Sequence, residues 1–211
     1  MNYPNLREEK KLRKKGFKTV IGLDEAGRGP LAGPVVAAAV FVKNLEAARK
    51  ELKGIRDSKK ISFQKREEFC KKIVNSSNVK WGIGRVSEKV IDRINILEAT
   101  KLAMKRALKI LDCKLRVASC KKADFLVLDG NFKIGQNIPQ KPIVKADEKV
   151  FSCAAASILA KVSRDKIMSN YEKKYPEYGF SRHKGYPTNF HYSMLRKHGP
   201  CKIHRNTFRL S

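Results

Sequence analysis

Four carboxylates in this 211-residue chain are placed where side chains can do metal-assisted chemistry. Asp24 and Glu25 are adjacent at the end of an apolar run. Asp129 ends the run Phe-Leu-Val-Leu, and Asp147 lies just before an alanine-rich stretch. Acids at strand ends and helix starts can converge on one edge of a sheet. Two like charges about 4 Å apart then repel by roughly 4 kcal/mol at an effective dielectric constant of 20, so either their pKa values rise or divalent cations lie between them.

Oxygen ligands of this kind favour magnesium or manganese over zinc. Two such ions at a short separation activate a water molecule and stabilise a leaving oxygen during phosphodiester hydrolysis. Taken singly, Asp129 or Asp147 is more simply explained as a turn former or a helix cap. The set of four acids, and not any one of them, therefore indicates a metal centre.

The charge of the chain indicates a polyanionic partner. It has 47 Lys and Arg against 20 Asp and Glu, a net charge of +27, which is typical of a phosphate-binding protein. A lysine-rich proteome alone would give the same excess, and an anionic membrane surface is a further class of partner. No strongly amphipathic basic helix, long apolar run or secretory signal is evident, so no membrane association and a cytoplasmic location are expected.

The five cysteines form no C-x-x-C pair and are expected to be reduced thiols, with a zinc site as the alternative.

Hydrophobic patterning predicts the elements that position the acids. Strands are expected at 18–23, 35–42, 79–86 and 125–128, with an extended segment at 142–146. Helices are expected at 62–74, 96–111 and 151–171. Core contacts are expected from Phe63, Phe69 and Ile73 in the first helix and from Ile96, Ala99, Ala103, Ala107 and Ile110 in the second. The short spacing of the first two strands favours a hairpin. The small residues Ala154 to Ala156 would let the last helix lie close on a sheet. Together, these strands and helices imply a mixed α/β sheet covered by helices.

The stretch from Gly22 to Val40 resembles the signature of the ribonuclease HII family, the bacterial type 2 ribonucleases H. The resemblance continues through Asp57-Ser58-Lys59-Lys60, 95–100, Leu128-Asp129-Gly130, Asp147 with 154–162 and Arg164-Asp165, 183–186, and Gly199-Pro200 with His204-Arg205. Two departures flank one acid: Ala146 precedes Asp147 where the family often has glycine, and Glu148 follows it.

The resemblance implies an α/β fold, with a ribonuclease H-like mixed five-stranded sheet flanked by helices and a C-terminal helical part. We expect a basic N-terminal segment over 1–15 and a ribonuclease H type 2 catalytic domain over 16–211. Residues from about 175 to 211 would form its helical appendage.

The same resemblance implies roles for individual residues. Asp24, Glu25, Asp129 and Asp147 would be the catalytic acids and the ligands of Mg²⁺ or Mn²⁺. The turn of Gly27, Arg28 and Gly29 would sense a ribonucleotide 2′-hydroxyl through its backbone, since glycine permits close approach and this hydroxyl separates RNA from DNA. Tyr186 would hydrogen-bond there and pack on the next sugar, with plain packing as the alternative. Candidate phosphate contacts, each with a surface or fold role as the alternative, are Lys59, Lys60, Lys161, Arg164, His183 and Lys184.

The activity implied by the resemblance is endonucleolytic hydrolysis of the RNA strand in RNA–DNA hybrids. Duplex DNA would also be nicked 5′ of embedded ribonucleotides, leaving 3′-hydroxyl and 5′-phosphate ends during ribonucleotide removal and primer processing. A monomer is expected, and a sliding clamp is a conceivable protein partner. Two rivals remain at this point. A non-catalytic basic binding protein would need no metal, and another metal nuclease or integrase-like enzyme of the same fold would not discriminate ribose.

Overall fold

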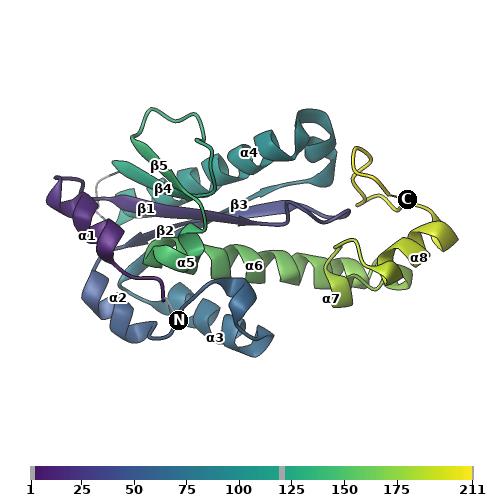
Figure 1. Ribbon diagram of the computed structural model, residues 1–211, viewed down its shortest axis with the longest axis horizontal. Helices are drawn as coiled ribbons and strands as arrows, with labels where there is room; N and C mark the ends of the chain where they lie inside the picture. The colour runs from purple at the N-terminus through teal and green to yellow at the C-terminus, as the bar shows by residue number, and fades with distance from the viewer. Residues whose placement is uncertain (1–2, 119–121, 211) are drawn as a thin grey trace.

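A five-stranded sheet separates two long helices in the computed structural model, which describes residues 3–118 and 122–210 (Figure 1). The strands are β1 Val20–Ala26, β2 Val35–Val42, β3 Val79–Val86, β4 Phe125–Asp129 and β5 Gln140–Ile143. They lie in the order β3-β2-β1-β4-β5. Strand β1 is antiparallel to β2 and parallel to β4, β2 is antiparallel to β3, and β4 is parallel to β5. The expected mixed sheet and its first hairpin are confirmed.

The helices cover both faces of this sheet. They are α1 Arg7–Lys14, α2 Leu45–Glu51, α3 Phe63–Asn75, α4 Glu88–Val117, α5 Ala146–Lys149, α6 Phe151–Glu172, α7 Phe180–His183 and α8 Asn189–His198, with short 3₁₀ turns η1 Ser58–Lys60 and η2 Pro176–Tyr178. Helix α4 lies on one face and α6 on the other, with α2 and α3 beyond α6, while α7 and α8 extend past the end of the sheet (Figure 1).

Glycines in the strands let both long helices approach the sheet closely, because a glycine has no side chain. A Cβ atom added to Gly84 of β3 would lie 2.0 Å from the carbonyl oxygen of Ala103 in α4. On the other face, a Cβ atom on Gly22 of β1 would lie 2.6 Å from the backbone of Ser152 in α6. Residues 154–156 of α6 are fully buried, which confirms that this alanine run lies close on the sheet.

Helix α4 begins earlier than the pattern predicts. It starts at Glu88 and is interrupted at Asn95, whose φ of 63° and ψ of 168° are not helical. The Asn95 Oδ1 atom accepts hydrogen bonds from the backbone N–H groups of Leu97 and Glu98, at 2.9 and 3.1 Å. Asn95 therefore acts as an internal N-cap, and the predicted start at residue 96 marks the second helical segment rather than the whole element.

Three further expectations are corrected. Phe63 is 52% exposed because it is the first residue of α3, whereas Phe69 and Ile73 are buried. Ile110 is 43% exposed because it lies on the flank of the α4 stripe. The segment at 142–146 is only partly extended, since β5 ends at residue 143 and α5 begins at Ala146.

The N-terminal helix α1 is packed against the start of α6. Leu6 and Leu12 are buried, and the Glu9 Oε1 atom accepts hydrogen bonds from the backbone N–H and the hydroxyl of Ser152, both at 2.9 Å. The first N–H groups of a helix have no partner within it, so Glu9 satisfies one of them in α6. Burial raises the pKa of Glu9.

The described cysteines carry no disulfide. Cys70, Cys113, Cys153 and Cys201 are free thiols, and Cys120 lies outside the described residues. Burial raises the pKa of Cys153 well above its ordinary value. In the described parts of the chain, every helix is too short or too polar to cross a membrane.

Three histidines pack together inside the C-terminal part. The rings of His183 and His191 stack with centroids 4.3 Å apart, and the Nε2 atoms of His191 and His204 are 3.0 Å apart. The other ring nitrogens are paired with backbone groups: His183 with Tyr178 O and Gly185 N, His191 with Tyr186 O, and His204 with Cys201 N. One set of neutral tautomers satisfies every ring nitrogen, with protons on Nε2 of His183 and His204 and on Nδ1 of His191. An additional proton would place two donors against each other.

Acidification is expected to destabilise this cluster. Burial lowers the pKa of His191 to about 4 and also lowers those of His183 and His204. The unfolded chain therefore binds more protons between pH 6.5 and 4, and stability falls as the pH falls; at pH 5 the loss from His191 alone is roughly 2 kcal/mol. An NMR titration of the ring protons and urea unfolding at pH 7 and 5 measure both effects. A midpoint near 6.5 for His191 would contradict this interpretation.

Candidate active site

Three of the four predicted acids meet at one edge of the sheet. Strands β1 and β4 are parallel with Leu23 beside Leu128, so the next residues, Asp24 and Asp129, lie side by side and point to the same face. Asp147 reaches them from α5, which directly precedes α6. Carboxylate oxygens of Asp24, Asp129 and Asp147 all lie within 4.8 Å of one another. Hard oxygen donors at this spacing suit magnesium or manganese.

Hydrogen bonds from neighbouring elements orient these acids. Asp129 Oδ1 accepts from the backbone N–H of Ala146 at 2.6 Å, which fixes the start of α5 relative to β4. Asp24 accepts from the hydroxyl of Ser157 in α6. Ser157 is in turn 2.9 Å from the hydroxyl of Ser58 in η1. The sequence motifs contained both serines, but only their proximity in the fold shows that they support an acid.

The electrostatics of the three acids favour a bound cation. Burial raises the pKa of Asp24 well above its ordinary value, and the charges of Glu25, Asp129 and Asp147 raise it further. Burial, with Asp129 and Asp57, raises the pKa of Asp147 to about 7. A divalent cation would remove the repulsion that causes part of these shifts, so the residues fit the metal that their chemistry implies.

Glu25 lies apart from this group. Side chains alternate along a strand, so Glu25 points away from the face that Asp24 occupies, and its Oε1 atom is 3.5 Å from Nη1 of Arg28. Burial raises its pKa to about 7; Arg28 opposes this rise and Asp129 adds to it. Metal binding by Glu25 therefore stays a prediction. Glu148 pairs with Lys60 at 3.0 Å, and it is Asp147 that faces the other acids.

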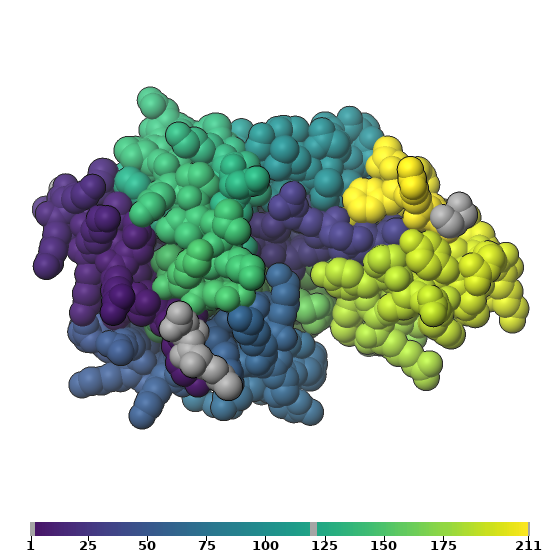
Figure 2. Space-filling view, viewed as in Figure 1, coloured from purple at the N-terminus to yellow at the C-terminus, as the bar shows by residue number. Residues whose placement is uncertain are grey.

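A cleft of about 770 Å³ lies beside the acids. Its lining residues are Glu25, Ala26, Gly27, Arg28, Gly29, Ser58, Lys59, Ile96, Ser157, Lys161 and Tyr186. Figure 2 shows the surface hollowed between the blue residues of the α2–α3 region and the C-terminal residues at the right. The predicted Gly27–Gly29 turn, Tyr186 and two of the predicted lysines thus share one cleft. The ring of Tyr186 is 38% exposed, and the Lys161 ammonium lies 5.8 Å from its centre.

Lys59 is held charged by the acids around it. Burial would lower its pKa, but the charges of Asp57, Asp147, Asp24 and Asp129 together outweigh that effect and raise it. Lys59 is therefore charged when the cleft takes up a phosphate.

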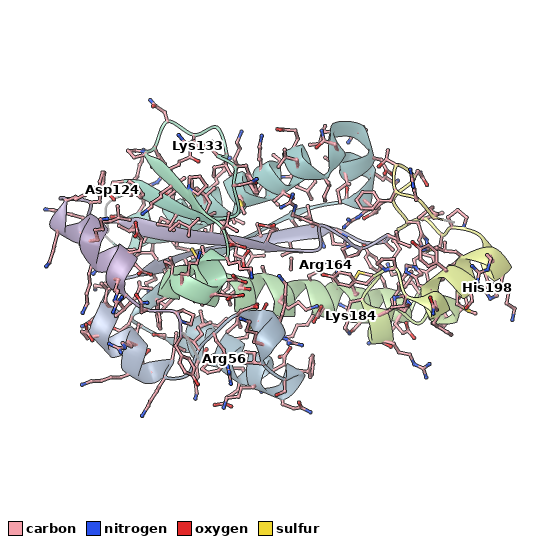
Figure 3. All side chains as sticks on the ribbon, viewed as in Figure 1. Arg56, Asp124, Lys133, Arg164, Lys184 and His198 are labelled. Carbon is pink, nitrogen blue, oxygen red and sulfur yellow. The ribbon has the colours of Figure 1, made fainter. Side chains whose placement is uncertain are left out.

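Two of the predicted phosphate contacts have buried side chains that bond within the protein, so phosphate contact by them stays a prediction. Arg164 is fully buried in α6 and donates to the carbonyl oxygens of Pro34, Ala32 and Lys184, at 3.0, 3.1 and 2.9 Å. His183 is used within the histidine cluster. Figure 3 labels Arg164 and Lys184 where α6 meets the C-terminal segment.

Lys60 and Lys184 are absent from the cleft lining. The Lys60 ammonium pairs with Glu148, and the Nζ atom of Lys184 donates to the hydroxyl of Ser169 at 2.9 Å. Phosphate contact by these two lysines stays a prediction.

Arg205 is the residue whose role the sequence did not reveal. It is fully buried, and its guanidinium donates to carbonyl oxygens of Gly27, Arg28 and Gly33. The motif His204-Arg205 marked its position, but one arginine among 47 basic residues gives no sign of burial.

Comparisons with known proteins agree with this geometry. A family model described as "Ribonuclease HII" matches residues 21–211. A ribonuclease HII of Geotalea uraniireducens is 48% identical over 207 residues, which cover 98% of this chain and 90% of that protein. Two solved structures share the fold. A ribonuclease HII of Archaeoglobus fulgidus, solved in a complex with PCNA, has a TM-score of 0.72 and 26% identity, covering 92% of this chain and 96% of that one. The ribonuclease H2 of Pyrococcus horikoshii has a TM-score of 0.69 and 28% identity, covering 91% and 94%.

Substitution of one acid is expected to stabilise the metal-free protein. Asp129→Asn removes one of three gathered charges, while its amide oxygen can still accept from the N–H of Ala146. Thermal unfolding in chelator should therefore give a Tm a few degrees above wild type. Magnesium or manganese should raise the Tm of wild type and leave that of the variant unchanged.

The matched control for this substitution is Asp112→Asn. Asp112 lies outside the cleft, and its carboxylate also accepts a backbone N–H, that of Ala123 at 3.3 Å. It should keep the full metal-dependent rise in Tm. A metal response retained by Asp129→Asn would show that the three acids are not the metal site.

Proposed function

Because the chain belongs to the ribonuclease HII family and is a ribonuclease H, we propose that it nicks duplex DNA 5′ of embedded ribonucleotides as well as cutting the RNA strand of RNA–DNA hybrids. One observation carries the finer part of this proposal. The Gly27–Gly29 turn faces Tyr186 across the cleft, directly beside the acids. A Cβ atom added to Gly29 would meet only the Cε1 atom of Tyr186, at 3.9 Å. This space suits a sugar edge, and the 2′-hydroxyl is the group that identifies ribose there.

Asp24, Asp129 and Asp147 would hold the metal, which we take to be magnesium or manganese. When bound, it supplies an activated water and charge stabilisation of the leaving oxygen. The chain's own residues then orient the substrate. The turn begins one residue after β1 ends, so a ribose held at the turn lies next to the acids, and the proposal assigns its 5′ phosphate to the metal. Cleavage of the bond between that phosphorus and the preceding 3′ oxygen leaves a 3′-hydroxyl and a 5′-phosphate.

Cations on the cleft wall neutralise the rest of the strand. Lys59 and Lys161 both line the cleft. Lys161 is held by Asp165 at 2.8 Å while its ammonium lies over the Tyr186 ring. Such contacts place the backbone and carry no sequence information, which suits an enzyme that recognises the sugar and not the base.

The biological role and partners follow from this chemistry as further proposals. Removal of misincorporated ribonucleotides and of residual primers needs this cut. The structure of the Archaeoglobus fulgidus relative was solved with PCNA. A sliding-clamp partner for this chain stays a prediction. The monomeric state and the cytoplasmic location of this chain stay predictions too.

The proposal is tested with a labelled DNA duplex that contains one ribonucleotide. In magnesium or manganese we expect a single nick on its 5′ side, with no cut in chelator and none in the all-DNA duplex. Asp129→Asn should be inactive although it folds. Tight binding without a cut in either metal, or equal cutting of the all-DNA duplex, would refute the proposal.

Two alanine substitutions separate substrate fit from folding. Gly29→Ala adds a methyl group with only Tyr186 nearby, so stability should be unchanged. The methyl occupies the space assigned to the sugar, and kcat/KM should fall by on the order of 100-fold. Gly27→Ala should instead lower the Tm, because Gly27 has a φ of +99° and the new Cβ would lie 2.1 Å from Nε of Arg164. Thermal unfolding and single-ribonucleotide cleavage measure the two effects, and full activity of Gly29→Ala would contradict the assignment.

A further inference from the structure

The buried side chain of Arg205 forms hydrogen bonds with both ends of the loop between β1 and β2, on the side of the loop that faces the protein interior. Its Nη2 atom donates to the carbonyl oxygen of Gly27 at 2.6 Å and its Nη1 atom to that of Arg28 at 2.9 Å. Its Nε and Nη2 atoms donate to the carbonyl oxygen of Gly33 at 3.0 and 2.9 Å. The backbone N–H of Arg205 donates to Leu31 O at 2.8 Å. One side chain from the C-terminal segment therefore bonds three carbonyl groups of the loop, while Arg164 of α6 bonds those of Ala32 and Pro34.

These bonds determine where the amides of the turn point. A trans peptide unit is planar, with its C=O and N–H on opposite sides. The carbonyl groups of Gly27 and Arg28 face Arg205 in the interior, so the N–H groups of Arg28 and Gly29 point to the opposite side. That side is the cleft, which all three turn residues line.

The two amides are available to a ligand. Within 3–118 and 122–210, neither the N–H of Arg28 nor that of Gly29 has a hydrogen-bond partner. Other amides of the same loop are used inside the protein: Leu31 N–H donates to Gly185 O and Gly33 N–H to Ile203 O, both at 2.8 Å. Two adjacent donors thus face the cleft, whereas the N–H groups of Leu31 and Gly33 are used inside the protein.

The guanidinium and the turn depend on each other. A fully buried charge is costly unless it is hydrogen-bonded, and in the described structure Arg205 has no carboxylate within ion-pair distance. The carbonyl groups of Gly27, Arg28 and Gly33 supply its partners. Turning either peptide over would remove a partner from the buried charge, so the orientation with both amides in the cleft is strongly preferred.

We infer that Arg205 is a positioning residue for ribose selectivity: it aims the amides of Arg28 and Gly29 at the 2′ oxygen of the substrate. The inference rests on the proposed function, since it assigns those donors to the ribonucleotide. Arg205 itself is buried beneath the turn and touches no substrate.

The test measures ribose selectivity in binding, so that it does not depend on the rate of cleavage. Arg205→Lys keeps the charge but cannot bond both turn carbonyl groups in the same fork geometry. Affinities are compared for two duplexes of the same sequence, one all DNA and one with a single ribonucleotide, in Ca²⁺ in place of Mg²⁺. The preference for the ribonucleotide duplex should fall about tenfold, equivalent to about 1.4 kcal/mol. Affinity for the all-DNA duplex should stay the same, because its phosphate contacts are intact.

Arg13→Lys is the matched control. The guanidinium of Arg13 also donates to backbone carbonyl oxygens, those of Val42 and Lys43, at the far end of β2. Its substitution should leave the preference unchanged. An unchanged preference in Arg205→Lys, or an equal loss of affinity for both duplexes, would overturn the inference. A wild-type protein without any preference would instead refute the proposed function.

A second measurement needs no variant of Arg205. The amide resonances of Arg28 and Gly29 are followed by NMR in the wild-type protein as each duplex is added. The ribonucleotide duplex should shift both resonances and slow their hydrogen exchange, and the all-DNA duplex should not. Identical responses to both duplexes would overturn the inference even if Arg205→Lys does not fold.

Discussion

Repulsion among gathered carboxylates is the constraint around which this molecule is arranged. Parallel pairing of β1 with β4 brings Asp24 beside Asp129, and the short helix α5 adds Asp147. Burial alone would favour the protonated acids, as their raised pKa values show. The surrounding elements hold the acids together nevertheless, through Ser157 and the backbone of Ala146. The repulsion among these acids lowers the stability of the metal-free protein, and in return the acids are already placed for a divalent cation.

The C-terminal part buries positive instead of negative side chains and pairs them with neutral backbone groups. Arg164 and Arg205 are buried cations whose partners are backbone carbonyl groups, and three histidines are neutral donors and acceptors. These contacts fix the segment that carries Tyr186 into the cleft: Arg164 donates to the carbonyl of Lys184, and His191 bonds that of Tyr186. Acids on the sheet would bind the metal, and the polar interior of the appendage shapes the wall opposite them.

Sequence patterns predicted what local spacing determines. Short apolar runs and the alanine run located the sheet, and acids at strand ends indicated where carboxylates gather, because these features depend on neighbours along the chain. The burial of Arg164 and His183 was not predictable, since a basic side chain looks the same whether it meets phosphate or carbonyl groups. The helical residues before Asn95 were missed because an asparagine next to a helical pattern marks a start and does not show that another helical segment precedes it.

The link between Arg205 and Gly27 spans 178 residues. During synthesis, β1 and the turn leave the ribosome long before the residue that orients them. Until Arg205 is added, the carbonyl groups of Gly27 and Gly33 lack the buried guanidinium that bonds them in the complete fold. The three acids precede Arg205 in the chain, so they are synthesised before the contact that holds the turn beside them.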